Sequence, residues 1–162
     1  MNDKIVDLNG AKIIVNKKKK TNFKQGYFIP KNPHKYVGDV TKIRYMSSWE
    51  LTTHQFFDNN NTVIKWSSET IAIPYFNPVK NRPAKYYPDY WVQYINIHNE
   101  VVNEIIEVKP KTQTAPPKAN KKNKLYESLT WSVNQAKWNA AKQFCLANNL
   151  SFRILTEDSI YK

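Results

Sequence analysis

Apolar residues recur at helical intervals in two segments of the chain. The first, residues 47–61, has the sequence SSWELTTHQFFDNNN, in which aromatic residues form an apolar stripe. Ser47 followed three residues later by Glu50 is the spacing of a capping box, which marks the start of a helix. The second segment, residues 130–149, keeps Val, Ala and Phe along one face. Both patterns predict amphipathic helices.

Other segments have the composition of β-strands. Residues 62–76 and 86–110 are rich in Val, Ile, Thr and aromatic side chains, and we place a turn at 98–100 within the second run. Residues 150–156 are predicted to form a last strand. The order of helix, about three strands, helix and strand predicts an α/β fold with a mostly central sheet.

Three further segments are basic. Residues 77–85 are predicted to be a loop fixed by prolines, and residues from about 110 to 126 a flexible loop. Residues 1–42 carry the run KKKK at 17–20 and have the composition of an arm laid over the surface. This arm is either a solvated tail or a phosphate-contacting element. Residues 43–162 are predicted to form a single globular domain.

The charge balance indicates the class of partner. The 162 residues carry 25 Lys and Arg against 13 Asp and Glu, a formal net charge of +12. This favours polyanions: nucleic acid first, then an acidic membrane surface or an acidic protein. A single cysteine, Cys145, excludes an internal disulfide and fits a reducing compartment. With no membrane-length apolar run and no secretory signal at the N-terminus, we expect a soluble cytoplasmic protein.

Three charged residues interrupt the predicted hairpin at one of its ends. Side chains alternate between the two faces of a strand, so Glu107 and Lys109 share a face. A three-residue turn would pair Ile97 with Val101, which sets Asp89 opposite Lys109. The three charged groups therefore converge on two adjacent strands.

That convergence has two explanations. Lys109 could form a structural salt bridge with one acid while the other acid is solvated at the strand end. Alternatively, Asp89 and Glu107 could hold Mg²⁺ between them, with the backbone carbonyl of Val108 as a further ligand. Lys109 would then orient the attacking water or stabilise the developing anion, as phosphodiester hydrolysis requires.

The same residues resemble a nuclease signature. Pro88-Asp89, then seventeen residues, then Glu107-Val108-Lys109 is similar to the PD-(D/E)xK motif. The resemblance implies a restriction-endonuclease-like core with the order α-β-β-β-α-β, here with a basic N-terminal arm. Many members place one more acid on the first helix, and Glu50 fits that role of metal contact. Its alternative role is that of the capping-box acid.

A more particular likeness extends from about residue 43 to 157. The chain resembles the TnsA-type transposon-end endonucleases and the head completion nucleases of large tailed phages. Its length and short basic N-terminus are closer to the phage nucleases. TnsA-like sites often have Gln where Glu107 stands. The blocks that carry the likeness are SSWE at 47–50, WSSE at 66–69, IPYFNP at 73–78, KYYPDYW at 85–91 and EVKP at 107–110.

Several other polar residues are candidates for supporting roles. Glu69 is either an acid that supports the metal ligands from behind or a strand-end charge. His54, one turn beyond Glu50, is either a similar supporting partner or an exposed or core-bordering histidine. No His and Cys spacing suggests zinc. The candidates for contact with DNA phosphates are Arg44, Arg82, Lys85 and Lys111.

The resemblance implies a Mg²⁺-dependent DNA nuclease, with Mn²⁺ able to substitute, that acts on double-stranded DNA in head completion and head–tail joining. Its other expected partners are phage head or portal proteins, and its expected location is the host cytoplasm during assembly or the virion head. One alternative is a DNA-binding structural head protein that does not cleave. Another is a transposon-end or junction endonuclease. The sequence places no constraint on oligomeric state or on endo- versus exonucleolytic action.

Overall fold

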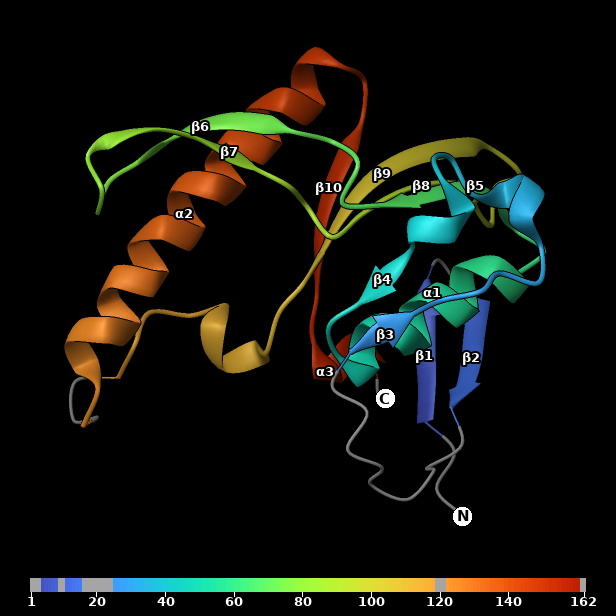
Figure 1. Ribbon diagram of the computed structural model, residues 1–162, viewed down its shortest axis with the longest axis horizontal. Helices are drawn as coiled ribbons and strands as arrows, with labels where there is room; N and C mark the ends of the chain where they lie inside the picture. The colour runs from blue at the N-terminus through green and yellow to red at the C-terminus, as the bar shows by residue number, and fades with distance from the viewer. Residues whose placement is uncertain (1–3, 9–10, 16–24, 119–121, 161–162) are drawn as a thin grey trace.

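A computed structural model of the protein describes residues 4–8, 11–15, 25–118 and 122–160 (Figure 1). The lysine run at 17–20 lies outside the described residues. Within the described part, four strands form a central sheet in the order β10-β9-β8-β5. Strand β9 is antiparallel to β8 and parallel to β10, and β8 is antiparallel to β5. The strands are β5 (Val63–Ser68), β8 (Tyr90–Ile95), β9 (Val101–Val108) and β10 (Ser151–Leu155).

Helix α1 (Ser48–Asn59) covers one face of this sheet. It begins as the sequence predicts, because the Ser47 side chain accepts a hydrogen bond from the Glu50 backbone N–H. Its apolar stripe packs on alternate residues of the strands, and this core centres on the fully buried rings of Phe57 and Trp66. The first core is therefore built from α1, β5 and the face of β8 that carries Tyr90, Val92 and Tyr94.

Helix α2 (Lys124–Ala147) lies on the opposite face. Its buried residues Trp138 and Ala141 contact Ile105 of the sheet. A two-stranded antiparallel ribbon, β6 (Ile73–Asn77) and β7 (Arg82–Tyr86), arches over the same helix (Figure 1). The sheet is thus enclosed between α1 on one side and α2 with the ribbon on the other, and the prediction of a mixed α/β fold is confirmed.

The segment before α1 packs against the domain. Strands β3 (Gly26–Tyr27) and β4 (Arg44–Tyr45) pair with each other, and the segment between them is held by Asp58 of α1. The Asp58 carboxylate is fully buried and accepts hydrogen bonds from the backbone N–H groups of Lys31 and Asn32. Whether residues 1–42 act as a separate arm stays a prediction.

The chain ends of the described part meet each other. Strands β1 (Lys4–Leu8) and β2 (Ala11–Val15) form a hairpin, and β1 lies against the short helix α3 (Glu157–Ile160). Short 3-10 turns occupy Pro33–Lys35, Val40–Lys42 and Lys111–Gln113. None of the described helices combines the length and the apolar character needed to cross a membrane.

Three details of the sequence interpretation were wrong. The β8–β9 turn spans 96–100 rather than 98–100, because the Asn96 side chain accepts hydrogen bonds from the N–H groups of His98 and Glu100. Residues 82–85, predicted as part of a loop, belong to strand β7. Helix α2 begins at Lys124 and not near residue 130.

Candidate active site at the start of β8 and the end of β9

The two predicted acids lie side by side on the face of the sheet that α2 covers. The β8–β9 ladder pairs Tyr90 with Ile106, so Asp89 follows next to Glu107, two residues away from its predicted partner Lys109. A shift of two residues keeps every side chain on its predicted face. Asp89 Oδ2 accepts a hydrogen bond of 2.6 Å from the Val108 N–H. This bond fixes the carboxylate at the point where the ladder ends.

Glu107 is the most enclosed member of the group. Its side chain is only 3% exposed, and its two oxygens have different partners. The Tyr86 hydroxyl donates to Oε2 at 2.6 Å, and the Lys109 ammonium lies 2.9 Å from Oε1. Lys109 is in turn held by its backbone N–H, which donates to the Leu155 carbonyl at 2.9 Å. The three predicted charged groups are therefore brought together.

The electrostatics of the cluster follow from its burial. Burial and the neighbouring charge of Glu107 raise the pKa of Asp89 to about 7, and the charge of Glu50 adds to this. Burial alone would lower the pKa of Lys109, but Glu107, Asp89 and Glu50 outweigh it and raise that pKa above its ordinary value. The site is thus a largely buried cluster of two carboxylates with one ammonium group at its side.

The residues present fit a hard divalent cation. Two adjacent carboxylates repel each other, and a cation between them would relieve the repulsion that raises the Asp89 pKa. The N–H and C=O of one strand residue point to the same neighbour, so the Val108 carbonyl is directed toward Asp89 as its N–H is. Among the described residues, no three His, Cys, Asp or Glu side chains form a ready-made metal group. Water and substrate oxygens would have to complete the shell.

Glu50 does not join this group directly. Its carboxylate is engaged at the start of its own helix, where Oε2 accepts from the Met46 N–H at 2.7 Å and Oε1 lies 3.1 Å from the Ser47 hydroxyl. It acts on the site through its charge, which contributes to the shifts of Asp89 and Lys109. A direct metal contact by Glu50 would require its side chain to leave the capping box.

The two predicted supporting residues occupy different surroundings. His54 is fully buried in the core, with Nδ1 2.8 Å from the Tyr90 hydroxyl and Nε2 2.9 Å from the Arg44 carbonyl oxygen. Burial lowers its pKa to about 4. Glu69 is exposed, has φ of 53°, and donates its backbone N–H to the Asp89 carbonyl at 3.1 Å. Glu69 therefore positions the backbone of Asp89.

The four predicted DNA-contacting residues lie in three places. Arg82 and Lys85 are exposed on β7, the strand that leads to Asp89. Arg44 is exposed on β4, with its guanidinium 5.6 Å from the centre of the Tyr27 ring. Lys111 forms an ion pair with Asp158 on α3 and is the least available of the four.

Two residues near the cluster received no firm role from the sequence. Tyr86 binds Glu107 as described above, and Lys137 of α2 lies with its ammonium 5.5 Å from the centre of the Tyr86 ring. Burial and the charge of Lys109 lower the Lys137 pKa, while Glu107 and Asp89 act in the opposite sense. Counting alternate residues along the strand from Asp89 predicts neither contact, because Tyr86 belongs to β7 and Lys137 to α2.

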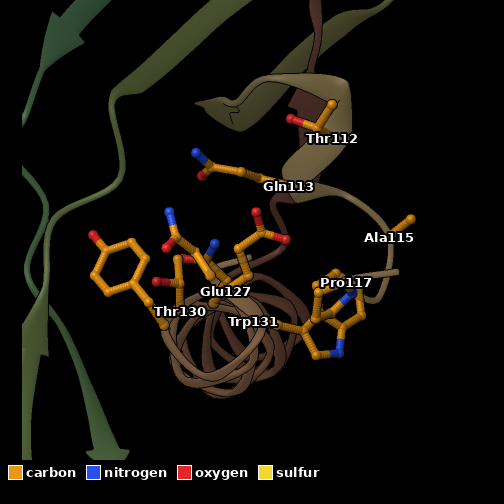
Figure 2. A pocket seen from close by; sticks show the side chains of 10 residues that line it. Thr112, Gln113, Ala115, Pro117, Glu127, Thr130 and Trp131 are labelled. Atoms are coloured by element: carbon orange, nitrogen blue, oxygen red, sulfur yellow. The ribbon is translucent and has the colours of Figure 1, made fainter. Parts of the chain in front are cut away.

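A cavity of about 260 Å³ lies between the 112–117 segment and the first half of α2 (Figure 2). Gln113 and Glu127 point toward one another across it, and Trp131 lies next to Pro117. None of the predicted catalytic residues lines this cavity. Asn134, about one helical turn before Lys137, also lines it.

Comparison with known proteins agrees with this geometry. The model of the TnsA-like endonuclease N-terminal family matches residues 60–157, and the chain belongs to this family. A head completion nuclease of Enterobacteria phage T4 is 39% identical over 142 residues, which cover 83% of this chain and 92% of the phage protein. Both relationships predicted from the sequence blocks are thereby confirmed.

Proposed function

We propose that this protein is a metal-dependent DNA nuclease that acts in phage head completion. The observation that carries the proposal is the contact of Asp89, Glu107 and Lys109 on one face of two adjacent strands. The membership in an endonuclease family and the similarity to a head completion nuclease support it. The order α1, β5, β8, β9, α2, β10 supports assignment of the PD-(D/E)xK core.

In this proposal, Asp89, Glu107 and the Val108 carbonyl bind Mg²⁺, with Mn²⁺ as a substitute. The bound ion would supply a nucleophilic water and neutralise charge on the phosphate. Lys109 is held by Glu107 at 2.9 Å and would stabilise the developing negative charge on the scissile phosphate. Glu50 adds negative charge that favours cation binding. Arg82 and Lys85 contact phosphates of double-stranded DNA along β7.

The direct test is cleavage of plasmid and linear DNA with and without Mg²⁺ or Mn²⁺. Losing a metal ligand removes several kcal/mol of transition-state stabilisation, so Asp89→Asn should lower the rate by about 10³-fold. Lys109→Met should cause a comparable loss. Asp39→Asn and Lys142→Met are matched controls, since both native side chains are exposed and distant from the cluster in sequence. Cleavage by Asp89→Asn protein at the wild-type rate would refute the assignment.

The same variants separate cleavage from a structural role. A structural head protein would assemble normally when Asp89→Asn is introduced into the phage, because it needs only DNA or portal contact. The nuclease proposal predicts filled heads that fail to join tails. We place this action in the host cytoplasm during assembly and at the phage head, where it would contact head or portal proteins.

A further inference from the structure

The β6–β7 ribbon has one buried face and one open face. Burial alternates along β6, and along β7 from Pro83 onward, as the period of two requires. Ile73 and Tyr86 point inward and pack with Trp138 of α2. On the open face, Phe76 is 54% exposed and Tyr87, the residue after β7, is 49% exposed. The ribbon, whose backbone crosses α2 (Figure 1), thus presents two aromatic rings to solvent.

The ribbon is also uniformly basic. Residues 70–88 contain Lys80, Arg82 and Lys85 and no acidic residue, and all three cations are exposed. A purely apolar partner would leave these charges without counter-charges as they lost water, which is unfavourable. Polyanions suit this surface better.

The open face leads directly into the candidate active site. Tyr87 lies two residues before Asp89. The register pairs Ile73 with Tyr86, which places Tyr87 beside Ala72, four residues along the ribbon from Phe76. At about 3.3 Å per residue, the two rings are roughly 13 Å apart, a span of about four stacked nucleotides.

We propose that the open face of the ribbon binds an unpaired DNA strand, whose bases stack on Phe76 and Tyr87 and whose phosphates contact Lys85, which shares that face. Aromatic platforms interleaved with cations are the combination that binds single strands without reading sequence. Paired duplex bases keep their faces stacked on one another and would gain nothing from these rings. The inference rests on the proposed nuclease function and specifies its substrate: DNA with a single-stranded portion leading to Asp89.

The test uses a single strand of about 16 nucleotides that carries an internal 2-aminopurine, and the blunt duplex of the same sequence. Binding is followed by anisotropy in EDTA, so that metal-dependent cleavage does not interfere. Phe76→Ala and Tyr87→Ala should each weaken single-strand binding by about 5- to 150-fold, the equivalent of one lost stacking contact. Duplex binding should change by less than about twofold. Leu146→Ala removes an apolar side chain on α2 that is even more exposed than Phe76 and Tyr87, and it is the control.

Two further readouts identify the contacts. Stacking should quench the 2-aminopurine fluorescence in the wild-type complex, and Phe76→Trp should retain the quenching that Phe76→Ala loses. Lys85→Gln should reduce the slope of log affinity against log salt by about 0.7 for the single strand. Tight binding of free deoxyadenosine monophosphate would show a mononucleotide pocket instead and overturn the proposal.

The outcomes distinguish this inference from the function on which it rests. Equal losses for single strand and duplex, or unchanged single-strand binding in both alanine variants, would overturn the stacking proposal even if the protein cleaves DNA. Selective single-strand losses support it. If the wild type failed to cleave any DNA with metal present, the proposed nuclease function would be refuted. The binding measurements in EDTA would still show whether the ribbon binds single-stranded DNA.

Discussion

The hydrogen bond from Tyr86 to Glu107 offers a sharp test of the proposed metal site. The hydroxyl donates to Oε2 at 2.6 Å, and both side chains are only 3% exposed. Burial, together with the charges of Glu107 and Asp89, raises the Tyr86 pKa far above its ordinary value. The hydroxyl therefore remains a donor at every pH at which DNA cleavage is measured. Tyr86→Phe removes this donor and keeps the ring.

The expected effect follows from the charge and the burial. A hydrogen bond to a charged group contributes about 1.5–3 kcal/mol, and a buried carboxylate oxygen that loses its donor is not resolvated by water. Loss of an outer partner of a metal ligand commonly costs about 10- to 100-fold in metal affinity. We expect Tyr86→Phe to weaken Mn²⁺ binding within this range.

Tyr75→Phe is the matched control. The Tyr75 ring lies 5.9 Å from the Lys137 ammonium, much as the Tyr86 ring does at 5.5 Å. Its hydroxyl, however, accepts only a long 3.3 Å hydrogen bond from the Asn77 side chain. Calorimetric titration with Mn²⁺ should therefore show a change of less than about twofold for Tyr75→Phe. Equal affinities for the two variants would refute the claim that Tyr86 supports a metal ligand.

Two further predictions concern stability and turnover. The His54 pKa is lowered to about 4 in the folded protein. The contribution of neutral His54 to folding stability is therefore complete above pH 6.5 and is lost as pH falls toward 4, at about 1.4 kcal/mol per pH unit. Between pH 7 and pH 5, the free energy of unfolding in urea should fall by about 2 kcal/mol more for the wild type than for His54→Gln. The raised Asp89 pKa changes stability in the opposite sense, but it does so in both proteins and cancels in the comparison. Parallel profiles would contradict a neutral buried His54. Lys137→Gln should lower the cleavage rate about tenfold, because its ammonium lies over the Tyr86 ring and feels the charges of Glu107 and Asp89, while exposed Lys142→Gln should change it less than about twofold. Equal rates for the two variants in plasmid cleavage would remove Lys137 from the site.

The faces of the strands could be predicted from the sequence because they depend only on a period of two. Asp89, Glu107 and Lys109 are on one face in the structure as expected, although the register differs by two residues. The register depends on the turn, and the Asn96 side chain organises a five-residue turn through two hydrogen bonds. Side-chain hydrogen bonds of this kind compete with shorter turns and leave little trace in an apolar pattern.

Contacts between distant elements were harder to predict. Most of β7 was taken for a loop, since Pro83 and exposed cations are unusual in a strand, yet the inner face of the β6–β7 ribbon packs on α2. Glu50 has two predicted roles, and the structure shows its carboxylate in the capping box that the sequence itself indicates, while its metal contact stays a prediction. The roles of Tyr86 and Lys137 depend on tertiary packing, which no single-segment pattern encodes.

The hydrogen bond between the Lys109 backbone and β10 has a consequence for the chain while it is being synthesised. The Lys109 N–H is bonded to the Leu155 carbonyl, and Lys111 is bonded to Glu157 and Asp158 of α3. A ribosome-bound chain that has emerged only as far as α2 lacks these anchors, so its lysine has no fixed position beside the acids. A nascent chain should therefore remain harmless to nearby DNA until its last strand is released.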